Sequence, residues 1–500
     1  MTGQTSQGQE QGHLRIAIIG AGMGGVLMAI KLKEAGFTDF VILEKGDRVG
    51  GTWRENTYPG LHCDFPSHFY SYSFFQNPNW SRRFSPGPEI REYLESAAHV
   101  FGVHDAIRFN SKVVDGQWEN DAWTITLDSG ETLVADILIT ATGYLHVPNF
   151  PDIAGLESFA GAKFHTAQWD HAVPLVDKRI GIIGTGSTST QLVAELAGKV
   201  ARLTVFQRTP QWVAQQDNPA YTEEEKRAFA ADPSLLAKMY EDEKAEMVTL
   251  ADGAVLGGNA DARAFLEANV RDNLARVKDP ELRRKLTPDY APGCKRIVIS
   301  PRFYEAIQDP GCELVTDRIT AVEPGGVRTA DGALHALDVL VIATGYDTQA
   351  YFRPLRLTGA GGQRIEDIWR ERPVAFRTMT VPHMPNFFMV EGPFSPIGNV
   401  CAFLTAELQV AHIIKLIRIA AEQDVAIAPR EDATAALLAT YRDAARKTIW
   451  ATGGCVSWYQ DSEGVPTLYP FPNQTFEAEM TADPDLAEYV VTPRHAQVPT

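Results

Sequence analysis

Cysteine is scarce in this chain, and its spacing matches no cysteine motif. Five cysteines occur among 500 residues, at Cys63, Cys294, Cys312, Cys401 and Cys455, without a CxxC or CxxxxC pair. A disulfide framework, a cysteine zinc site and a redox-active dithiol would each need such paired spacings. The sequence therefore predicts none of the three and no metal, and it favours a reduced setting.

The chain also lacks an excess of basic residues and any long apolar run. It carries 46 lysines and arginines against 63 acidic residues, a formal net charge of −17. This balance argues against a nucleic-acid partner and against adhesion to anionic membranes. No apolar run is long enough to span a bilayer, and the polar start "MTGQTSQGQEQG" lacks the pattern of a signal peptide. We therefore expect a cytoplasmic protein without a membrane span.

Two stretches of the sequence share a strand–turn–helix–strand pattern. The first begins at Leu14 with "LRIAIIGAGMGG" and the second at Lys178 with "KRIGIIGTGSTS"; each continues into a helical pattern and a second apolar run. This is the βαβ unit with a glycine-rich turn. The sequence thus predicts an α/β protein with two Rossmann-like dinucleotide-binding domains.

Each βαβ unit is followed by an apolar run that ends in Ala-Thr-Gly-Tyr, at 141–144 and 343–346. We interpret these runs as strands that pass the chain from one domain to the other. Between them, an acidic and alanine-rich stretch predicts a helical insertion in the second domain. The predicted parts are a flexible N-terminus at 1–13, an FAD-binding domain at 14–148 and 346–500, an NADP-binding domain at 149–215 and 288–345, and a helical insertion at 216–287.

The two glycine-rich loops differ at the position that selects the nucleotide. The first loop, from Gly20 to Gly25, is a complete GxGxxG, and Glu44 ends its second strand. The equivalent position of the second unit is Arg208. A carboxylate there accepts hydrogen bonds from ribose hydroxyls, whereas an arginine suits a 2′-phosphate. The first site should hold FAD or NAD and the second NADP, with Thr209 and Lys295 adding to the phosphate site; a solvated surface arginine is the alternative for Arg208.

A third pattern precedes the second loop. Phe159, Gly161, His165, Trp169 and Asp170 satisfy F-x-G-x-x-x-H-x-x-x-W-[P/D]. With this fingerprint, with "GGTW" at 50–53 and with "GCKR" at 293–296, nearly the whole chain resembles the type I Baeyer–Villiger monooxygenases of the flavin-containing monooxygenase superfamily. Ser189 departs from the pattern, because it replaces the third glycine of the second loop.

The resemblance implies an activity, its cofactors and its catalytic residues. It implies NADPH- and O₂-dependent oxidation of a ketone to an ester or lactone through a C4a-peroxyflavin, with FAD bound. Arg296 matches the fixed cation of this chemistry, and Asp64 its acidic partner. We expect His165 to couple the two domains rather than to act as a catalytic base. The small-molecule ketone and O₂ are the expected partners, and nothing indicates the oligomeric state.

The loops and the resemblance together predict two sets of cofactor contacts. For FAD they are Gly20, Gly22, Met23, Gly25, Glu44, Gly51, Thr52, Trp53, Asp64, Tyr70 and Val113. For NADP they are Gly184, Thr185, Gly186, Ser187, Ser189, Thr190, Gln191, Arg208, Thr209, Lys295 and Trp458. Three other functions stay open: an N- or S-oxygenating flavin monooxygenase, a pyridine-nucleotide reductase, and a flavin-binding protein without turnover.

Overall fold

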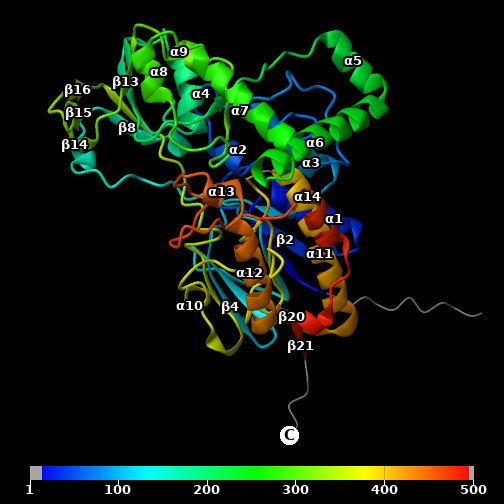
Figure 1. Ribbon diagram of the computed structural model, residues 1–500. Helices are drawn as coiled ribbons and strands as arrows, with labels where there is room; N and C mark the ends of the chain where they lie inside the picture. The colour runs from blue at the N-terminus through cyan, green and yellow to red at the C-terminus, as the bar shows by residue number, and fades with distance from the viewer. Residues whose placement is uncertain (1–13, 399, 495–500) are drawn as a thin grey trace, which may run out of the picture.

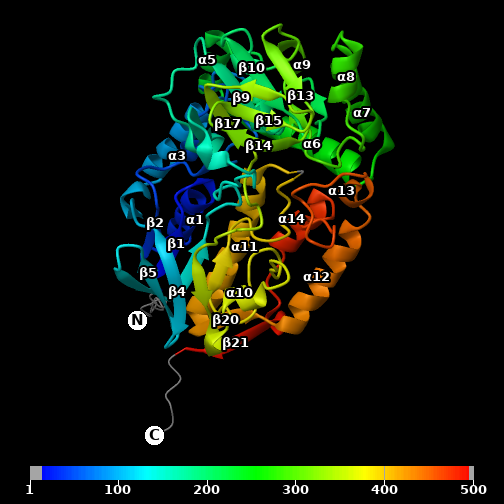
Figure 2. The ribbon, with the colours of Figure 1, turned by 90° about the vertical axis from the view of Figure 1, so that its left-hand side faces the viewer.

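The computed structural model describes residues 14–398 and 400–494. The predicted flexible N-terminus, residues 1–13, lies outside this range. Within the described residues, no helix is both long enough and apolar enough to cross a membrane. In both views the chain forms two sheet-containing parts, one above the other, with helices packed around them (Figures 1 and 2).

The lower part contains a five-stranded parallel sheet in the order β19-β7-β1-β2-β3. Its strands are β1 (Ile16–Ile19), β2 (Phe40–Leu43), β3 (Ile107–Arg108), β7 (Ile137–Thr140) and β19 (Phe387–Met389). β1 and β7 are buried along their whole length, as expected for parallel strands covered on both faces. Helices α1 (Met23–Glu34), α3 (Gly87–Val100) and α11 (Ala402–Gln423) contribute to the same core.

The upper part contains a second five-stranded parallel sheet, in the order β13-β10-β9-β17-β8 (Figure 2). Its strands are β8 (Ala162–His165), β9 (Arg179–Ile183), β10 (Arg202–Phe206), β13 (Cys312–Val315) and β17 (Val339–Ile342). Helix α4 (Ser187–Leu196) follows the second glycine-rich loop. These two sheets confirm the predicted α/β fold with two Rossmann-like units.

Smaller elements complete the two parts. A four-stranded mixed sheet has the order β18-β4-β5-β6, with β18 (Arg356–Thr358) parallel to β4 (Val113–Glu119) and antiparallel pairing through β5 (Ala122–Leu127) and β6 (Thr132–Ala135). Antiparallel sheets are formed by β14 (Ile319–Glu323), β15 (Gly326–Thr329) and β16 (Leu334–Ala336), and by β20 (Val425–Pro429) and β21 (Tyr489–Pro493). Strands β11 (Val213–Ala214) and β12 (Val298–Ile299) form a parallel pair. The remaining helices outside the insertion are α2 (Thr52–Glu55), α9 (Phe303–Ala306), α10 (Ile365–Ile368), α12 (Glu431–Ala445), α13 (Ile449–Thr452) and α14 (Asn473–Thr481).

The stretch predicted as a helical insertion is helical. It contains α5 (Glu223–Ala231), α6 (Pro233–Val255), α7 (Ala260–Ala275) and α8 (Pro280–Leu286). Side-chain caps begin each helix, at Thr222, Asp232, Asn259 and Asp279, because each accepts hydrogen bonds from backbone N–H groups of the first turn. Glu243 of α6 accepts a hydrogen bond from the backbone of Phe69, which ties the insertion to the lower part.

The domain bounds remain a proposal, and the membership of the sheets supports it. All strands of the lower sheet come from 14–148 and 346–500, and all strands of the upper sheet come from 149–215 and 288–345. Side-chain hydrogen bonds join the two units: Tyr58 donates to Gln191, and Gln191 donates to the carbonyl of His62. These bonds hold helix α4 of the upper part against the lower part.

One prediction about the cysteines is wrong. Cys294 and Cys455 form a disulfide, with their Cα atoms 6.0 Å apart. The two cysteines are separated by 161 positions, so their spacing carries no motif and only the folded chain brings them together. Cys63, Cys312 and Cys401 are free thiols.

Candidate functional site

A large cavity lies where the two parallel sheets face each other. It has a volume of about 1790 Å³ and is lined by both glycine-rich loops and both Ala-Thr-Gly-Tyr segments. In α/β folds ligands bind outside the carboxyl ends of parallel strands, and these segments all follow such ends. A pocket for one drug-sized ligand has roughly 300–1,000 Å³, so this cavity has room for more than one group.

The first loop has the geometry of a phosphate-binding turn. Gly20 has a φ of +105°, and a Cβ at Gly25 would lie 1.8 Å from the Gly20 carbonyl oxygen. Both positions therefore require glycine, one for the turn and one for the close packing of α1 on β1. Helix α1 begins at Met23 without a side-chain cap, so its first N–H groups remain available to an anion.

Glu44 lies at the end of β2, and its carboxylate is already held in place. Its oxygens accept hydrogen bonds from the N–H of Ala21 at 2.8 Å, the N–H of Gly46 at 2.7 Å and the guanidinium of Arg54 at 2.6 Å. A carboxylate has about four lone-pair positions, so one position remains for a ribose hydroxyl. Glu44 lines the cavity, as its predicted role requires.

The second loop repeats this geometry. Gly184 has a φ of +119°, and Thr185 donates from Oγ1 to the carbonyl of Thr209 at 2.7 Å, which joins the loop to the end of β10. Ser189, which replaces the third glycine, is 1% exposed and faces the core. Gly184, Thr185, Gly186, Ser187 and Gln191 line the cavity, whereas Ser189 and Thr190 do not.

Arg208 and Lys295 form a cationic end of the cavity. Both line it, together with Thr209, although they are far apart in the sequence. Burial lowers the pKa of Lys295, and the neighbouring charge of Arg208 lowers it further. A phosphate bound between these two cations would relieve their mutual repulsion, so this end of the cavity favours anion binding.

Asp64 and Arg296 meet inside the cavity. Arg296 Nη2 donates to Asp64 Oδ1 at 2.6 Å, a short charge-assisted hydrogen bond. Burial acts to lower the pKa of Arg296, but Asp64, and then the neighbouring Tyr144 and Tyr459, raise it above its ordinary value. Arg296 is therefore a permanent cation. Its side chain remains 31% exposed to the cavity.

Aromatic side chains flank this ion pair. Trp458 stacks on Tyr144 with ring centroids 6.0 Å apart and planes 19° from parallel. Trp458 is 39% exposed and lines the cavity. Tyr70 packs edge-on against Trp53, at 5.7 Å between centroids, and both line the same cavity. The predicted flavin contacts Met23, Gly51, Thr52 and Val113 also line the cavity, whereas Gly25 lies behind it.

The fingerprint lies behind the cavity wall. Phe159, Gly161, His165, Trp169 and Asp170 surround the edge strand β8, and none of the five lines the cavity. His165 is fully buried, its Nδ1 accepts from the N–H of Ala167, and burial lowers its pKa. Trp169 packs edge-on against Phe164, at 4.8 Å. These contacts agree with a positioning rather than a chemical role for His165.

Sequence reasoning missed several cavity residues. Arg54 pairs with Glu44, Tyr144 stacks on Trp458, and Glu391 lines the cavity after β19. For Arg54 and Tyr144 a signal existed, because each lies within or beside a predicted motif. Glu391 had none, since a single acid after an apolar run is equally typical of a loop.

The half of the chain that contains both nucleotide loops matches a known protein family. A family model described as "Pyridine nucleotide-disulphide oxidoreductase" matches residues 17–255. That range contains both glycine-rich loops and the fingerprint, so the match covers the dinucleotide-binding scaffold. The CxxxxC pair of a disulfide reductase is absent from the sequence.

More specific similarities extend over nearly the whole chain. A Baeyer–Villiger monooxygenase of Streptomyces coelicolor is 38% identical over 97% of this chain and 94% of its own. Cyclohexanone monooxygenase from Rhodococcus sp. Phi1, solved bound to NADP⁺, is 30% identical with a TM-score of 0.84, over 96% of this chain and 99% of that chain. OTEMO, solved in complex with FAD and NADP, is 25% identical with a TM-score of 0.85, over 97% of this chain and 100% of that chain.

Two dinucleotide loops that share one cavity, together with these similarities, define a flavin-dependent monooxygenase. Within that class the chain belongs to the Baeyer–Villiger monooxygenase family. The resemblance inferred from the fingerprint is thereby confirmed.

Proposed function

We propose that this enzyme inserts one oxygen atom of O₂ beside the carbonyl carbon of a ketone, giving an ester or a lactone. NADPH supplies a hydride, which carries two electrons and one hydrogen; with one proton these reduce the second oxygen atom to water, and NADP⁺ is released. The observation that carries the proposal is the Arg296–Asp64 pair, a permanent cation fixed in the cavity between the two nucleotide loops.

FAD and NADP(H) are the cofactors, and the residues of the first loop fit FAD. The N–H groups at the N-terminus of α1 would donate hydrogen bonds to its pyrophosphate, and the free lone pair of Glu44 would accept one from a ribose hydroxyl. When bound, FAD would supply the two-electron activation of O₂. Trp53, Asp64 and Tyr70, which line the cavity, would then lie around the site of oxygen transfer.

The chain's own contribution to oxygen transfer is electrostatic. Oxygen insertion passes through species with negative charge on oxygen, and a preorganised cation lowers their free energy. Arg296 supplies that cation and cannot lose its proton at any working pH. Asp64 holds the guanidinium in a fixed orientation, so little reorganisation is needed when the charge develops.

NADPH would bind at the cationic end of the cavity. Arg208 and Lys295 would hold its 2′-phosphate, and the N-terminus of α4 its pyrophosphate. Trp458, which stacks on Tyr144 and lines the cavity, would cover the bound cofactor. The hydride donor and the site of oxygen transfer would then share one cavity.

The runner-up function is N- or S-oxygenation with the same cofactors. The same two nucleotide loops would serve it, and an electron-rich amine or sulfide would replace the ketone. Arg296 in the cavity favours the ketone reaction, because ketone oxidation needs a stabilised anionic oxygen nucleophile. Trp169 favours it only through the resemblance of the fingerprint to that of the Baeyer–Villiger monooxygenases.

Product analysis separates the two functions. The purified FAD-loaded enzyme is incubated with NADPH, O₂ and parallel panels of cyclic, aryl and linear ketones, amines and sulfides. We expect ester or lactone from at least one ketone, with one labelled oxygen atom from ¹⁸O₂. N- or S-oxides without any ester would establish the runner-up, and NADPH oxidation that gives only hydrogen peroxide with every panel would contradict both.

A further inference from the structure

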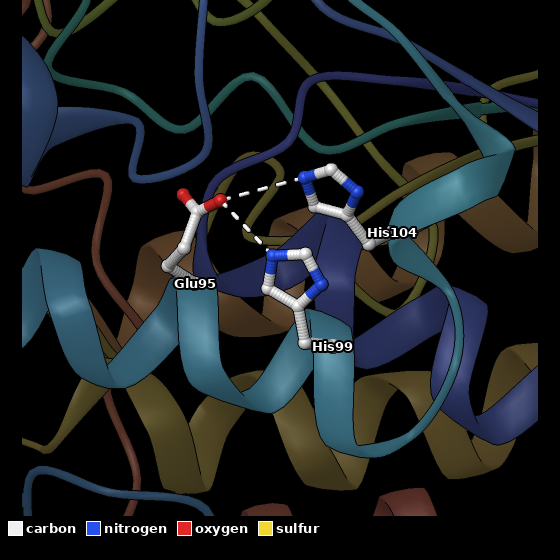
Figure 3. A group of neighbouring side chains, drawn as sticks. All are labelled: Glu95, His99 and His104. Carbon is white, nitrogen blue, oxygen red and sulfur yellow. Dashed lines mark ion pairs between the residues drawn. The ribbon is translucent and has the colours of Figure 1, made fainter.

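Three metal-ligating side chains meet on the lower part of the molecule, away from the cavity. Glu95 and His99 lie on successive turns of α3, and His104 begins the short 3-10 helix His104–Ala106 that follows (Figure 3). One ligand atom of each residue lies within 4.8 Å of the others. None of the three lines the cavity, so they take no part in the proposed oxygenation.

The distances in this triad suit a shared ion better than direct hydrogen bonds. Glu95 Oε1 lies 3.5 Å from His99 Nε2 and 3.4 Å from His104 Nε2. Hydrogen bonds between such atoms measure about 2.7–3.2 Å. Ligand atoms about 2.0–2.2 Å from a tetrahedral Zn²⁺ are separated from each other by about 3.4 Å. Figure 3 shows the carboxylate oxygen facing both imidazole nitrogens.

The backbone that carries the triad is held in place without a metal. The turn between α3 and His104 is closed by backbone hydrogen bonds from Gly102 to His99 and from Val103 to Ala98. Lys33 on α1 donates to the carbonyls of Phe101 and Gly102. The two histidine rings stack with centroids 3.9 Å apart and planes 19° from parallel, so both rings must turn before their Nε2 lone pairs point at one ion. The backbone is therefore preorganised, and only side-chain rotations accompany binding.

Charged groups lie near the outer atoms of the ligands, at distances beyond a hydrogen bond. Asp105 Oδ1 lies 3.8 Å from His104 Nδ1, the ring nitrogen that would not bind the ion. Arg91 Nη1 lies 4.0 Å from Glu95 Oε2, so the two oxygens of this carboxylate face different partners. A small movement of the exposed Asp105 side chain would let it accept a hydrogen bond from His104, the contact that fixes the orientation of a ligating histidine.

We propose that Glu95, His99 and His104 bind a zinc-type divalent cation that joins the end of α3 to the following segment. Two imidazole nitrogens and one carboxylate oxygen suit Zn²⁺, Co²⁺ or Ni²⁺, whereas Mg²⁺ and Ca²⁺ require oxygen ligands. Three protein ligands leave the fourth position to water. We expect a dissociation constant on the order of micromolar, weaker than that of a four-ligand structural zinc site.

Isothermal titration of the EDTA-treated, FAD-loaded enzyme with ZnCl₂ tests the site. We expect one equivalent to bind, and binding to weaken by more than about tenfold in E95Q, H99N and H104N. Mg²⁺ should give no saturable binding. The matched control is H383N, because His383 is also a partly exposed histidine paired with a glutamate, Glu431, but without a second histidine. This control should bind Zn²⁺ as the parent does.

Thermal unfolding supplies a second measurement that does not depend on catalysis. Zn²⁺ at about 100 times its dissociation constant should stabilise the parent by roughly 2.7 kcal/mol, and this shift should be absent in H104N. Flavin content and circular dichroism verify that each variant is folded. If H104N does not fold, H99N, which alters the most exposed ligand, replaces it in this measurement. The proposal is overturned if the parent binds no equivalent below about 100 µM, or if the three variants bind Zn²⁺ with the affinity of the parent.

Discussion

Arg296 donates a hydrogen bond of 2.6 Å to Asp64, a residue 232 positions earlier in the chain. Asp64 follows the loop that lines the first nucleotide site, and Arg296 follows the cysteine that joins the upper part to the C-terminal segment. The pair therefore bridges the two dinucleotide-binding units at their shared cavity. In the proposed function, oxygen transfer would therefore depend on how the two units face each other.

Arg296→Ala should separate reduction from oxygenation. We expect NADPH to reduce the flavin at nearly the parent rate, while ester formation falls by roughly 100-fold or more, which corresponds to about 3 kcal/mol of lost stabilisation. Anaerobic stopped-flow reduction and chromatography of the ester measure the two steps. Arg302→Ala is the matched control, since Arg302 lies on the same segment but outside the cavity. An alanine variant that forms ester at the parent rate would remove Arg296 from the mechanism.

Arg208→Ala should reduce the preference for NADPH over NADH. The 2′-phosphate would lose a charge-assisted hydrogen bond worth about 1.5–3 kcal/mol, so KM for NADPH should rise by roughly 10- to 100-fold while KM for NADH changes little. Steady-state kinetics with both coenzymes measure this. Arg202→Ala tests for a general charge effect, because Arg202 is exposed at the other end of β10 and pairs with Glu313. Equal use of both coenzymes by the parent would contradict the assignment.

The fold and the centre of the site could be predicted because both depend on local patterns. The glycine-rich turns at Gly20 and Gly184 require a positive φ, and each occurs between an apolar strand and a helix. The equivalence of Glu44 and Arg208 follows from the matched lengths of the two βαβ units. Asp64 and Arg296 were found through motifs, and the structure brings them into contact.

The remaining features depend on which distant segments meet, and sequence patterns do not encode that. Cys294 and Cys455 are bonded although no motif joins them. Ser189 and Thr190 occupy motif positions, yet they face the core instead of the cavity. His104 joins Glu95 and His99 because a turn folds back on α3. Each of these outcomes depends on how the elements pack together and on the direction in which each side chain then points.

Glu391→Gln should remove a pH dependence of stability. Glu391 is 8% exposed, its Oε1 has no hydrogen-bond partner in residues 14–398 and 400–494, and burial raises its pKa to about 8. Between the unfolded value of 4.5 and about 8, the folded protein keeps a proton that the unfolded chain releases. The contribution of Glu391 to the free energy of unfolding therefore falls as pH rises through this window, by up to about 1.4 kcal/mol per pH unit.

Urea unfolding of the parent and of Glu391→Gln at pH 5.5, 6.5, 7.5 and 8.5 checks this prediction. The difference between the two free energies should shift steadily in favour of the glutamine variant up to about pH 8 and then level off. Glu157→Gln is the control, since the Glu157 side chain is 91% exposed and pairs with Lys163 at the surface. Parallel curves for parent and Glu391→Gln would show that Glu391 is ionised throughout.

Cys455→Ser should weaken both stability and coenzyme binding. The bond to Cys294 closes a loop of 161 positions, and such a closure stabilises a folded chain by roughly 5 kcal/mol at most. Lys295 and Arg296 directly follow Cys294, and Trp458 lies close behind Cys455, so the bond also holds two walls of the cavity together. We expect a lower unfolding midpoint and a several-fold higher KM for NADPH, and the parent treated with a thiol reductant should behave alike. Cys312→Ser, at a free cysteine, should change neither quantity. Thiol titration of the denatured parent provides the direct check: three reactive thiols before reduction and five after it support the bond, whereas five before reduction would exclude it.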